Sequence, residues 1–175
     1  DEARAIGAVV ASDECYAEFT WDGAPRTILQ HGHDGVVAVH SLSKRSNFAG
    51  ARAGFYAGDA ELVGYLSEVR KHAGFMVPGP VQAAGAVVWA DDAHVAEQAA
   101  RYHARLVVLV TAFAAIGLEA ELPGGAFYLW VPAPDGDAWA LARRLAVEGG
   151  ALVSPGEFYG PAGAGHVRVA AVQPL

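Results

Sequence analysis

Apolar runs separated by polar turns predict three strands in the first part of the chain. Gly7–Asp13 is a nearly continuous apolar run, the pattern of a parallel strand that is covered on both faces. Val36–Ser41 is a second strand-forming run. Arg52–Gly58 is a third, and its glycines permit close approach of a cofactor or of a neighbouring backbone. The turn-forming segment Asp22–Pro25 lies between the first two strands.

Apolar residues at intervals of three or four predict helices in the middle of the chain. Asp59 has the side chain of an N-cap, and the helix that it begins extends to about His72. A second, apolar helix is predicted over Pro80–Ala90. A long helix follows from Asp91 to about Ile116, and its length makes it a plausible link between two domains.

After the long helix the pattern changes to a strand, a helix and two strands. Ala126–Val131 is strand-forming, and Asp137 is expected to cap a helix in which Trp139 faces inward. Ala151–Ser154 and His166–Ala170 predict the two further strands. This order indicates a small mixed domain at the end of the chain.

Composition argues against several classes of protein. The 175 residues carry 12 basic and 19 acidic side chains, a net charge of −7, so no basic surface is predicted for nucleic acid. The sequence contains no uninterrupted apolar run of about 18 residues, so no membrane span is predicted. Cys15 is the single cysteine, which excludes an internal disulfide and fits a reducing cytoplasm. His31, His33 and His40 lack partners at metal-ligand spacing and are interpreted as surface histidines, so no metal is expected.

One lysine is the leading candidate for catalysis. Lys44 follows a predicted strand, lies among hydroxyl side chains and precedes Arg52 by eight positions. Such a lysine can bond to an aldehyde cofactor, with hydroxyls and a guanidinium for the cofactor's phosphate. One strand earlier, Asp13 and Tyr16 provide the acid and the phenol that pyridoxal phosphate needs at its ring nitrogen and phenolic oxygen. Taken alone, the lysine motif also fits a polar surface loop.

The motifs Asp13…Tyr16, Ser41–Lys44 and Arg52 together resemble those of the fold-type I, pyridoxal-phosphate-dependent aminotransferases of the class I/II group. Ser41–Phe48 and Arg70–Gln82 are more narrowly similar to bacterial succinyldiaminopimelate aminotransferase, an enzyme of lysine biosynthesis. The resemblance extends over nearly the whole chain.

The resemblance implies an α/β fold in three parts. Residues 1–92 are expected to form the C-terminal half of the large cofactor-binding domain, with a mostly parallel sheet and helices. Residues 93–116 are the connecting helix, and residues 117–175 are a small α+β domain. Family members are much longer, so the chain is expected to be the C-terminal part of a homodimeric cytoplasmic enzyme, and the isolated fragment is expected to be inactive.

The resemblance also implies a role for each matching residue. Lys44 is expected to bond to the cofactor and to move the substrate proton. Asp13 is expected to keep the ring nitrogen protonated, and Tyr16 to hydrogen-bond to the phenolic oxygen. The expected phosphate ligands are Ser41, Ser43 and Arg52. Arg168 is expected to bind the substrate carboxylate, because a guanidinium can hold a carboxylate through two hydrogen bonds.

Several functions remain open. The expected reaction transfers an amino group between an amino acid such as glutamate and a keto acid, succinylated 2-amino-6-ketopimelate in its narrow version. A carbon–sulfur β-lyase or a decarboxylase would keep the same Lys44, Asp13 and Arg52. An aminotransferase-like effector domain of a transcriptional regulator and a non-catalytic remnant are the remaining alternatives.

Overall fold

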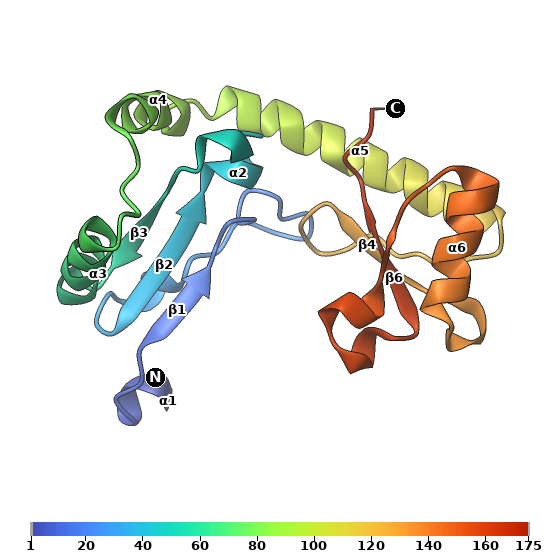
Figure 1. Cartoon of the computed structure of the whole chain (residues 1–175), viewed down its shortest axis with the longest axis horizontal. Coiled ribbons are helices and arrows are strands. Elements are labelled where there is room, and N and C mark those ends of the chain that lie inside the picture. Colours follow the sequence, from blue (N-terminus) through green and yellow to red (C-terminus); the bar gives the residue numbers. More distant parts are fainter. Residues whose placement is uncertain (1, 175) are drawn as a thin grey trace. The chain divides into compact units, whose positions relative to one another are not determined.

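A computed structural model describes residues 2–174 of the chain and divides it into two compact units, Asp1–Glu97 and Gln98–Leu175 (Figure 1). The first unit holds the elements α1 (Glu2–Ala5), β1 (Val10–Asp13), η1 (Ile28–His31), β2 (Val36–Ser41), α2 (Leu42–Arg45), η2 (Ala49–Ala51), β3 (Gly54–Gly58), α3 (Ala60–His72) and α4 (Gly79–Trp89). Helix α5 (Ala93–Ala115) begins in this unit and continues into the second.

The first unit is built on a sheet of three strands in the order β1–β2–β3. β1 and β2 are parallel, and Asp13 pairs with Val39 at their carboxyl ends. β3 is antiparallel to β2, with Ser41 opposite Gly54. β2 is central, and its first three residues are buried. The carboxyl ends of β1 and β2 therefore lie side by side, which brings together two segments that the sequence separates.

β1 differs from its prediction. Its side chains alternate between half-buried and exposed, and Val9 just before it is 59% exposed. The expectation that Gly7–Asp13 is covered on both faces is wrong for the described chain, in which β1 is an edge strand of the sheet. An edge strand meets fewer neighbours than a central strand, so its apolar side chains keep more contact with solvent.

The helix predictions of the first unit are confirmed. Asp59 accepts hydrogen bonds from the backbone N–H groups of Glu61 and Leu62 over 2.9 and 3.1 Å, which caps α3. The same carboxylate also accepts from the N–H of Gly35 over 2.9 Å, so the cap joins α3 to the start of β2. α4 and α5 lie within a residue or two of their predicted bounds.

The second unit contains β4 (Tyr128–Pro132), η3 (Pro134–Gly136), α6 (Ala138–Gly149), β5 (Ser154–Pro155), η4 (Gly156–Tyr159), η5 (Pro161–Gly163) and β6 (His166–Ala170). Its sheet is antiparallel in the order β4–β6–β5. Leu129, Val131 and Val167 are fully buried on one face of this sheet. Because strand side chains alternate, Trp130 and Arg168, which pair across β4 and β6, lie on the opposite face.

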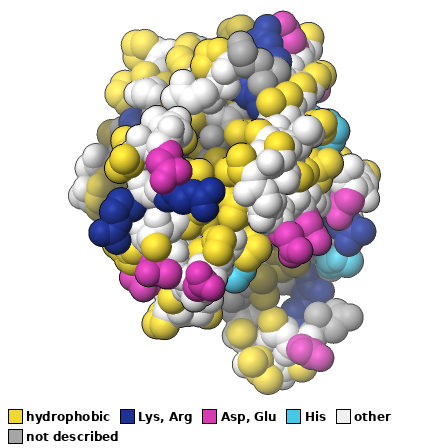
Figure 2. Space-filling model, turned by 90° about the vertical axis from the view of Figure 1, so that its right-hand side faces the viewer, with side chains coloured by type: hydrophobic (Ala, Val, Ile, Leu, Met, Phe, Trp, Pro, Cys, Tyr) yellow, Lys and Arg dark blue, Asp and Glu magenta, His cyan; other side chains and the backbone are white. Residues whose placement is uncertain are grey.

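Trp139 corrects the prediction for α6. Its indole is 46% exposed and donates a hydrogen bond to a Glu157 carboxylate oxygen over 2.8 Å, while Ala138 and Leu141 face the core. Other large apolar side chains also reach the surface, and Figure 2 shows hydrophobic side chains over much of one face between scattered charged ones. Leu152 is 92% exposed.

Candidate active site

Asp13, Cys15 and Lys44 gather where β1 and β2 end. Asp13 is the exposed last residue of β1, and one of its carboxylate oxygens accepts from the backbone N–H of Cys15 over 3.1 Å. Hydrogen bonds from the thiol and the backbone of Cys15 hold the pKa of Asp13 below its usual range, so this carboxylate is ionised at neutral pH.

The pKa of the Cys15 thiol is set by burial and by the charged groups around it. Burial is the largest cause that raises its pKa to about 11, followed by the hydrogen bond to Asp13 and by the charges of Asp13 and Glu18. The charge of Lys44 acts in the opposite direction and lowers the pKa of the thiol. The predicted acid ends β1 and the predicted lysine lies on the helix that directly follows the neighbouring strand β2, so residues 31 positions apart in the sequence lie at the same edge of the sheet.

Ser41, Ser43 and Arg52 line a single pocket of about 930 Å³ in the first unit, together with His40 and Trp89. Ser41 is the N-cap of α2, and its hydroxyl oxygen accepts from the N–H of Ser43 over 3.1 Å, which leaves the hydroxyl proton for another acceptor. Lys44 is half-buried on the short helix α2 and does not line this pocket. The three predicted phosphate ligands therefore share one pocket.

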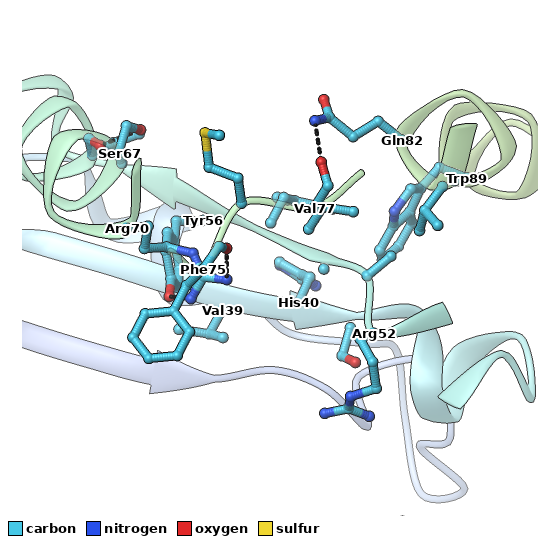
Figure 3. Close-up of a pocket in the computed structure, with 18 of the residues that line it drawn as sticks. Val39, His40, Arg52, Tyr56, Ser67, Arg70, Phe75, Val77, Gln82 and Trp89 are labelled. Atoms are coloured by element: carbon cyan, nitrogen blue, oxygen red, sulfur yellow. Dashed lines mark hydrogen bonds between the residues drawn. The ribbon is translucent and has the colours of Figure 1, made fainter. Parts of the chain in front are cut away.

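Arg52 has an unusual backbone. It has a positive φ of 54° in the left-handed region, a conformation that costs a non-glycine residue about 1 kcal/mol or more and is concentrated at ligand sites. Its guanidinium is exposed and donates to the backbone oxygen of Ala49 over 3.0 Å. Figure 3 shows Arg52 at one end of the pocket, with the guanidinium pointing away from Trp89.

The rest of the pocket has an aromatic and polar wall. Arg70 on α3 donates to the backbone oxygen of Phe75 over 2.8 Å and to the hydroxyl of Tyr56 over 3.3 Å. Gln82 on α4 donates to the backbone oxygen of Val77 over 2.7 Å, as Figure 3 shows. These bonds hold the segment between α3 and α4 over the sheet and shape the mouth of the pocket.

Glu14 and His40 form a buried pair beside this site. Glu14 is 6% exposed; one of its oxygens accepts from the N–H of Ile28 over 2.7 Å, and the other lies 3.2 Å from Nε2 of His40. Burial raises the pKa of Glu14, but hydrogen bonds from Ile28 and neighbouring hydroxyls, with the charge of His40, outweigh it and leave the pKa lowered. The interpretation of His40 as a surface histidine is wrong, because its ring also stacks on Phe55 at 4.8 Å.

Arg45 is a second group whose role the sequence did not reveal. The side chain follows Lys44, is 4% exposed and bonds to Glu18 over 3.0 Å, to the backbone oxygen of Val88 over 3.1 Å and to Asp92. Its guanidinium carbon lies 4.7 Å from the ring centre of Trp89. Arg45 therefore ties α2, which carries Lys44, to the end of α4 and the start of α5.

Tyr16 lies in the turn after β1 and is half-buried. Its backbone oxygen accepts from the N–H of Phe19 over 2.9 Å, which closes that turn. The turn places Tyr16 near the end of β1, as predicted, and the partner of its phenol in catalysis stays a prediction.

Arg168 lies in the second unit, half-buried on the central strand β6. Its guanidinium carbon is 4.5 Å from the ring centres of both Tyr128 and Tyr159. The side chain thus has a defined position on the face of the sheet that is opposite the core. Its role toward a substrate stays a prediction.

The side chains of the first unit fit pyridoxal phosphate. Two serine hydroxyls and an arginine are donors for a phosphate, and they line one pocket. Asp13, ionised at the end of β1, can pair with a protonated ring nitrogen, and Lys44 within reach of the same strand ends can bond to an aldehyde. This donor set, on a sheet in which the lysine follows the central strand, is of the kind that a pyridoxal phosphate needs.

Comparison with known proteins identifies the family. The sequence pattern of the aminotransferases of class I and II matches residues 1–174, and the chain belongs to this family. It is 49% identical over 173 residues to the 4-dedimethylamino-4-oxo-anhydrotetracycline transaminase OxyQ of Streptomyces rimosus, with 96% of this chain and 48% of that protein covered. A probable aminotransferase of Mycobacterium tuberculosis is 48% identical, with 96% and 41% covered.

The fold is also similar to that of solved aminotransferase structures. A crystal structure of an aminotransferase from Neisseria meningitidis superposes with a TM-score of 0.89 and 35% identity, over 98% of this chain and 47% of that one. The predicted α/β class, part of a pyridoxal-phosphate transferase fold, is therefore confirmed. The chain spans about half the length of the curated relatives it matches. The bounds predicted for the three parts stay predictions.

Two kinds of feature are absent from the described residues. Within residues 2–174, no group of three or more histidine, cysteine and acidic side chains is arranged to hold a metal ion. No helix in that range is long and apolar enough to cross a membrane.

Proposed function

We propose that this chain is part of a pyridoxal-phosphate-dependent aminotransferase that transfers an amino group between an amino acid and a keto acid. The observation that carries the proposal is the position of Asp13 at the end of β1 and of Lys44 directly after the parallel strand β2, next to a pocket lined by Ser41, Ser43 and Arg52. Family membership supports it.

Each side chain has a task in this proposal. Pyridoxal phosphate, when bound, supplies an electron sink for the charge that develops at the substrate Cα. Asp13 keeps the ring nitrogen protonated through its negative charge, and Tyr16 donates to the phenolic oxygen. Lys44 takes the proton from Cα and returns it to the acceptor carbon. Ser41, Ser43 and Arg52 hold the phosphate, and Arg168 binds the substrate carboxylate.

The substrates are proposed in two versions. Glutamate is the proposed amino donor. Relatives include an LL-diaminopimelate aminotransferase of Syntrophobacter fumaroxidans at 34% identity, which supports an acceptor in lysine biosynthesis such as a succinylated amino-ketopimelate. The relative OxyQ is named for a tetracycline ketone and supports a polycyclic ketone as the second candidate. Steady-state turnover with each acceptor in turn, with glutamate present, decides between them.

Two further properties belong to the same proposal. We propose a homodimer, which the exposed apolar side chains such as Leu152 support, because large exposed apolar areas mark contact sites between proteins. We also propose a place in the cytoplasm, which the unpaired Cys15 supports. Light scattering of the purified protein tests the dimer.

The experiment for the cofactor uses the small number of lysines in the sequence, which are Lys44 and Lys71. The purified chain and an N-terminally extended form of it are mixed with pyridoxal phosphate, reduced with borohydride and digested. The expected result is a visible absorption band and a mass gain on the Lys44 peptide, which Lys44→Ala removes and Lys71→Ala leaves unchanged. Equal labelling of both lysines, or no band in either form, contradicts the proposal.

Reaction type needs its own control. An aminotransferase loses its absorption band with glutamate and regains it with a keto acid. A β-lyase or a decarboxylase turns over without a keto acid. Turnover that is independent of a keto acid would therefore replace the aminotransferase proposal with one of these alternatives.

A further inference from the structure

Two tyrosines surround the guanidinium of Arg168. Tyr128 is the first residue of β4 and Tyr159 the last of η4, and both ring centres lie 4.5 Å from the guanidinium carbon. This distance is well within the range of a cation–π contact. Two cation–π contacts thus converge on one arginine, and we call Tyr128 and Tyr159 the tyrosine frame.

Hydrogen bonding at Nε does not explain the position of Arg168. The Nε atom is buried and has no hydrogen-bond partner among the described residues. A buried donor without a partner costs free energy, so other contacts must hold the side chain in place. The two rings of the frame provide such contacts.

Tyr159 is itself held by a tightly packed loop. Gly156 and Gly163 approach so closely that a Cβ on either would overlap the carbonyl oxygen of the other. A Cβ on Gly156 would also lie 2.8 Å from the Trp130 ring. Trp130 contacts Tyr159 edge to face at 5.9 Å and stacks on His166 at 5.3 Å. The loop therefore presents Tyr159 to Arg168 from a fixed backbone.

We propose that Tyr128 and Tyr159 are positioning residues that hold Arg168 ready to bind the α-carboxylate of the amino-acid substrate. This inference rests on the proposed role of Arg168. A cation–π contact does not use up the N–H donors of a guanidinium, and those donors bind a carboxylate in pairs. An arginine already held in one orientation loses less conformational freedom when the carboxylate arrives.

The test separates the frame from the arginine. In the N-terminally extended, cofactor-loaded protein, the KM for glutamate and the Kd for the unreactive carboxylate succinate are measured by the change in visible absorption. We expect Tyr128→Leu and Tyr159→Leu each to raise both constants by about 5-fold to 30-fold, the range that a lost cation–π contact gives, and to leave kcat within about twofold. Tyr128→Phe and Tyr159→Phe keep the ring, so we expect changes within about twofold.

Two controls complete the series. Tyr65 is a 69% exposed tyrosine on α3, and Tyr65→Leu should change neither constant. Arg168→Gln should raise both constants by more than either leucine variant does, because it removes the charged group itself. If Arg168→Gln leaves both constants unchanged, the proposed role of Arg168 fails. If it raises them and both leucine variants do not, only the frame is overturned.

A measurement on the unmodified protein covers the case in which a leucine variant does not fold. Nitrogen-15 NMR of arginine side chains reports rotation about the Nε–Cζ bond. We expect slow rotation for Arg168 and fast rotation for Arg144, whose side chain is 49% exposed. Equal, fast rotation at both arginines contradicts the tyrosine frame without any substitution.

Discussion

Glu14 and His40 meet at 3.2 Å across the ends of β1 and β2, one residue beyond Asp13 and one residue before Ser41. Each of these two residues is therefore adjacent in sequence to a proposed cofactor ligand. The pair joins the strand that carries the acid to the strand that leads to the lysine. Its energetics should thus influence how well both ligands are placed.

Substitution of Glu14 tests this link. Glu14→Gln keeps an acceptor for the Ile28 N–H but loses the charge, and we expect a loss of about 1–2 kcal/mol in the free energy of unfolding. Glu14→Ala removes both contacts and should cost about 2–4 kcal/mol. Denaturant unfolding measures both. Equal, small losses would show that the pair contributes little.

The lowered pKa of Glu14 gives the effect a pH dependence. A carboxylate whose pKa is lower in the folded state stabilises that state fully above the unfolded value, near 4.5, and the contribution disappears as pH falls through the folded value. The stability difference between wild type and Glu14→Gln should therefore shrink below pH 4.5. A difference that stays constant down to pH 3 would contradict this.

Cys15 should react slowly. Its pKa is raised from 9.0 to about 11, so the thiolate fraction at pH 8 falls about 100-fold. We expect alkylation by iodoacetamide to be slower than that of a free thiol by about this factor and to speed up as pH rises toward 11. Asp13→Asn removes a neighbouring negative charge and should accelerate the reaction, which mass spectrometry can follow. An unchanged rate would argue against the Asp13–Cys15 contact.

Arg45 should tolerate no replacement, even by lysine. An ammonium cannot reproduce the several hydrogen bonds of the planar guanidinium together with its contact to the Trp89 ring, so Arg45→Lys should lower the free energy of unfolding by about 2–4 kcal/mol. The matched control is Arg144→Lys, because Arg144 forms an exposed pair with Glu148 and should change stability by less than about 0.5 kcal/mol. Similar values for both would contradict the tying role of Arg45.

Gly156 and Gly163 should also resist substitution. Alanine at either position would overlap backbone, so we expect Gly156→Ala and Gly163→Ala to destabilise the protein by about 2 kcal/mol or more. Beyond the local backbone of α3, no described atom lies within 4 Å of the position that a methyl group on Gly64 would take, and Gly64→Ala should stabilise by about 0.5–1 kcal/mol. Thermal unfolding of the three variants gives the comparison.

The local signals predicted most elements of the fold. Asp59 and Asp137 each cap the helix that was predicted to follow them, because an acid before an apolar periodic run has one common structural use. The strands before Lys44 and around Arg168 also lie where the apolar pattern predicted them. Asp13 and Lys44 came from the motif, and they lie at the end of β1 and just after the neighbouring parallel strand β2.

Other features depend on contacts that no local pattern contains. Glu14 is buried where one carboxylate oxygen accepts from the N–H of Ile28 and the other lies 3.2 Å from Nε2 of His40, residues 14 and 26 positions away. Trp139 fits the helical period of a core residue, yet its indole bonds to Glu157 on a different element. The prediction that β1 is covered on both faces was wrong because an apolar run identifies a strand but not its position in the sheet. That position decides which side chains cover the strand.

The adjacent acids Asp13 and Glu14 also fix the register of β1 against its neighbour β2. Side chains alternate along a strand, so a slip of one residue would exchange an exposed carboxylate for a buried one. Glu14 opposes such a slip because only in the native register does its carboxylate contact the N–H of Ile28 and the ring of His40. A single-residue insertion between Val10 and Asp13 would thus leave every proposed site residue in the sequence and still turn Asp13 away from the position proposed for the cofactor.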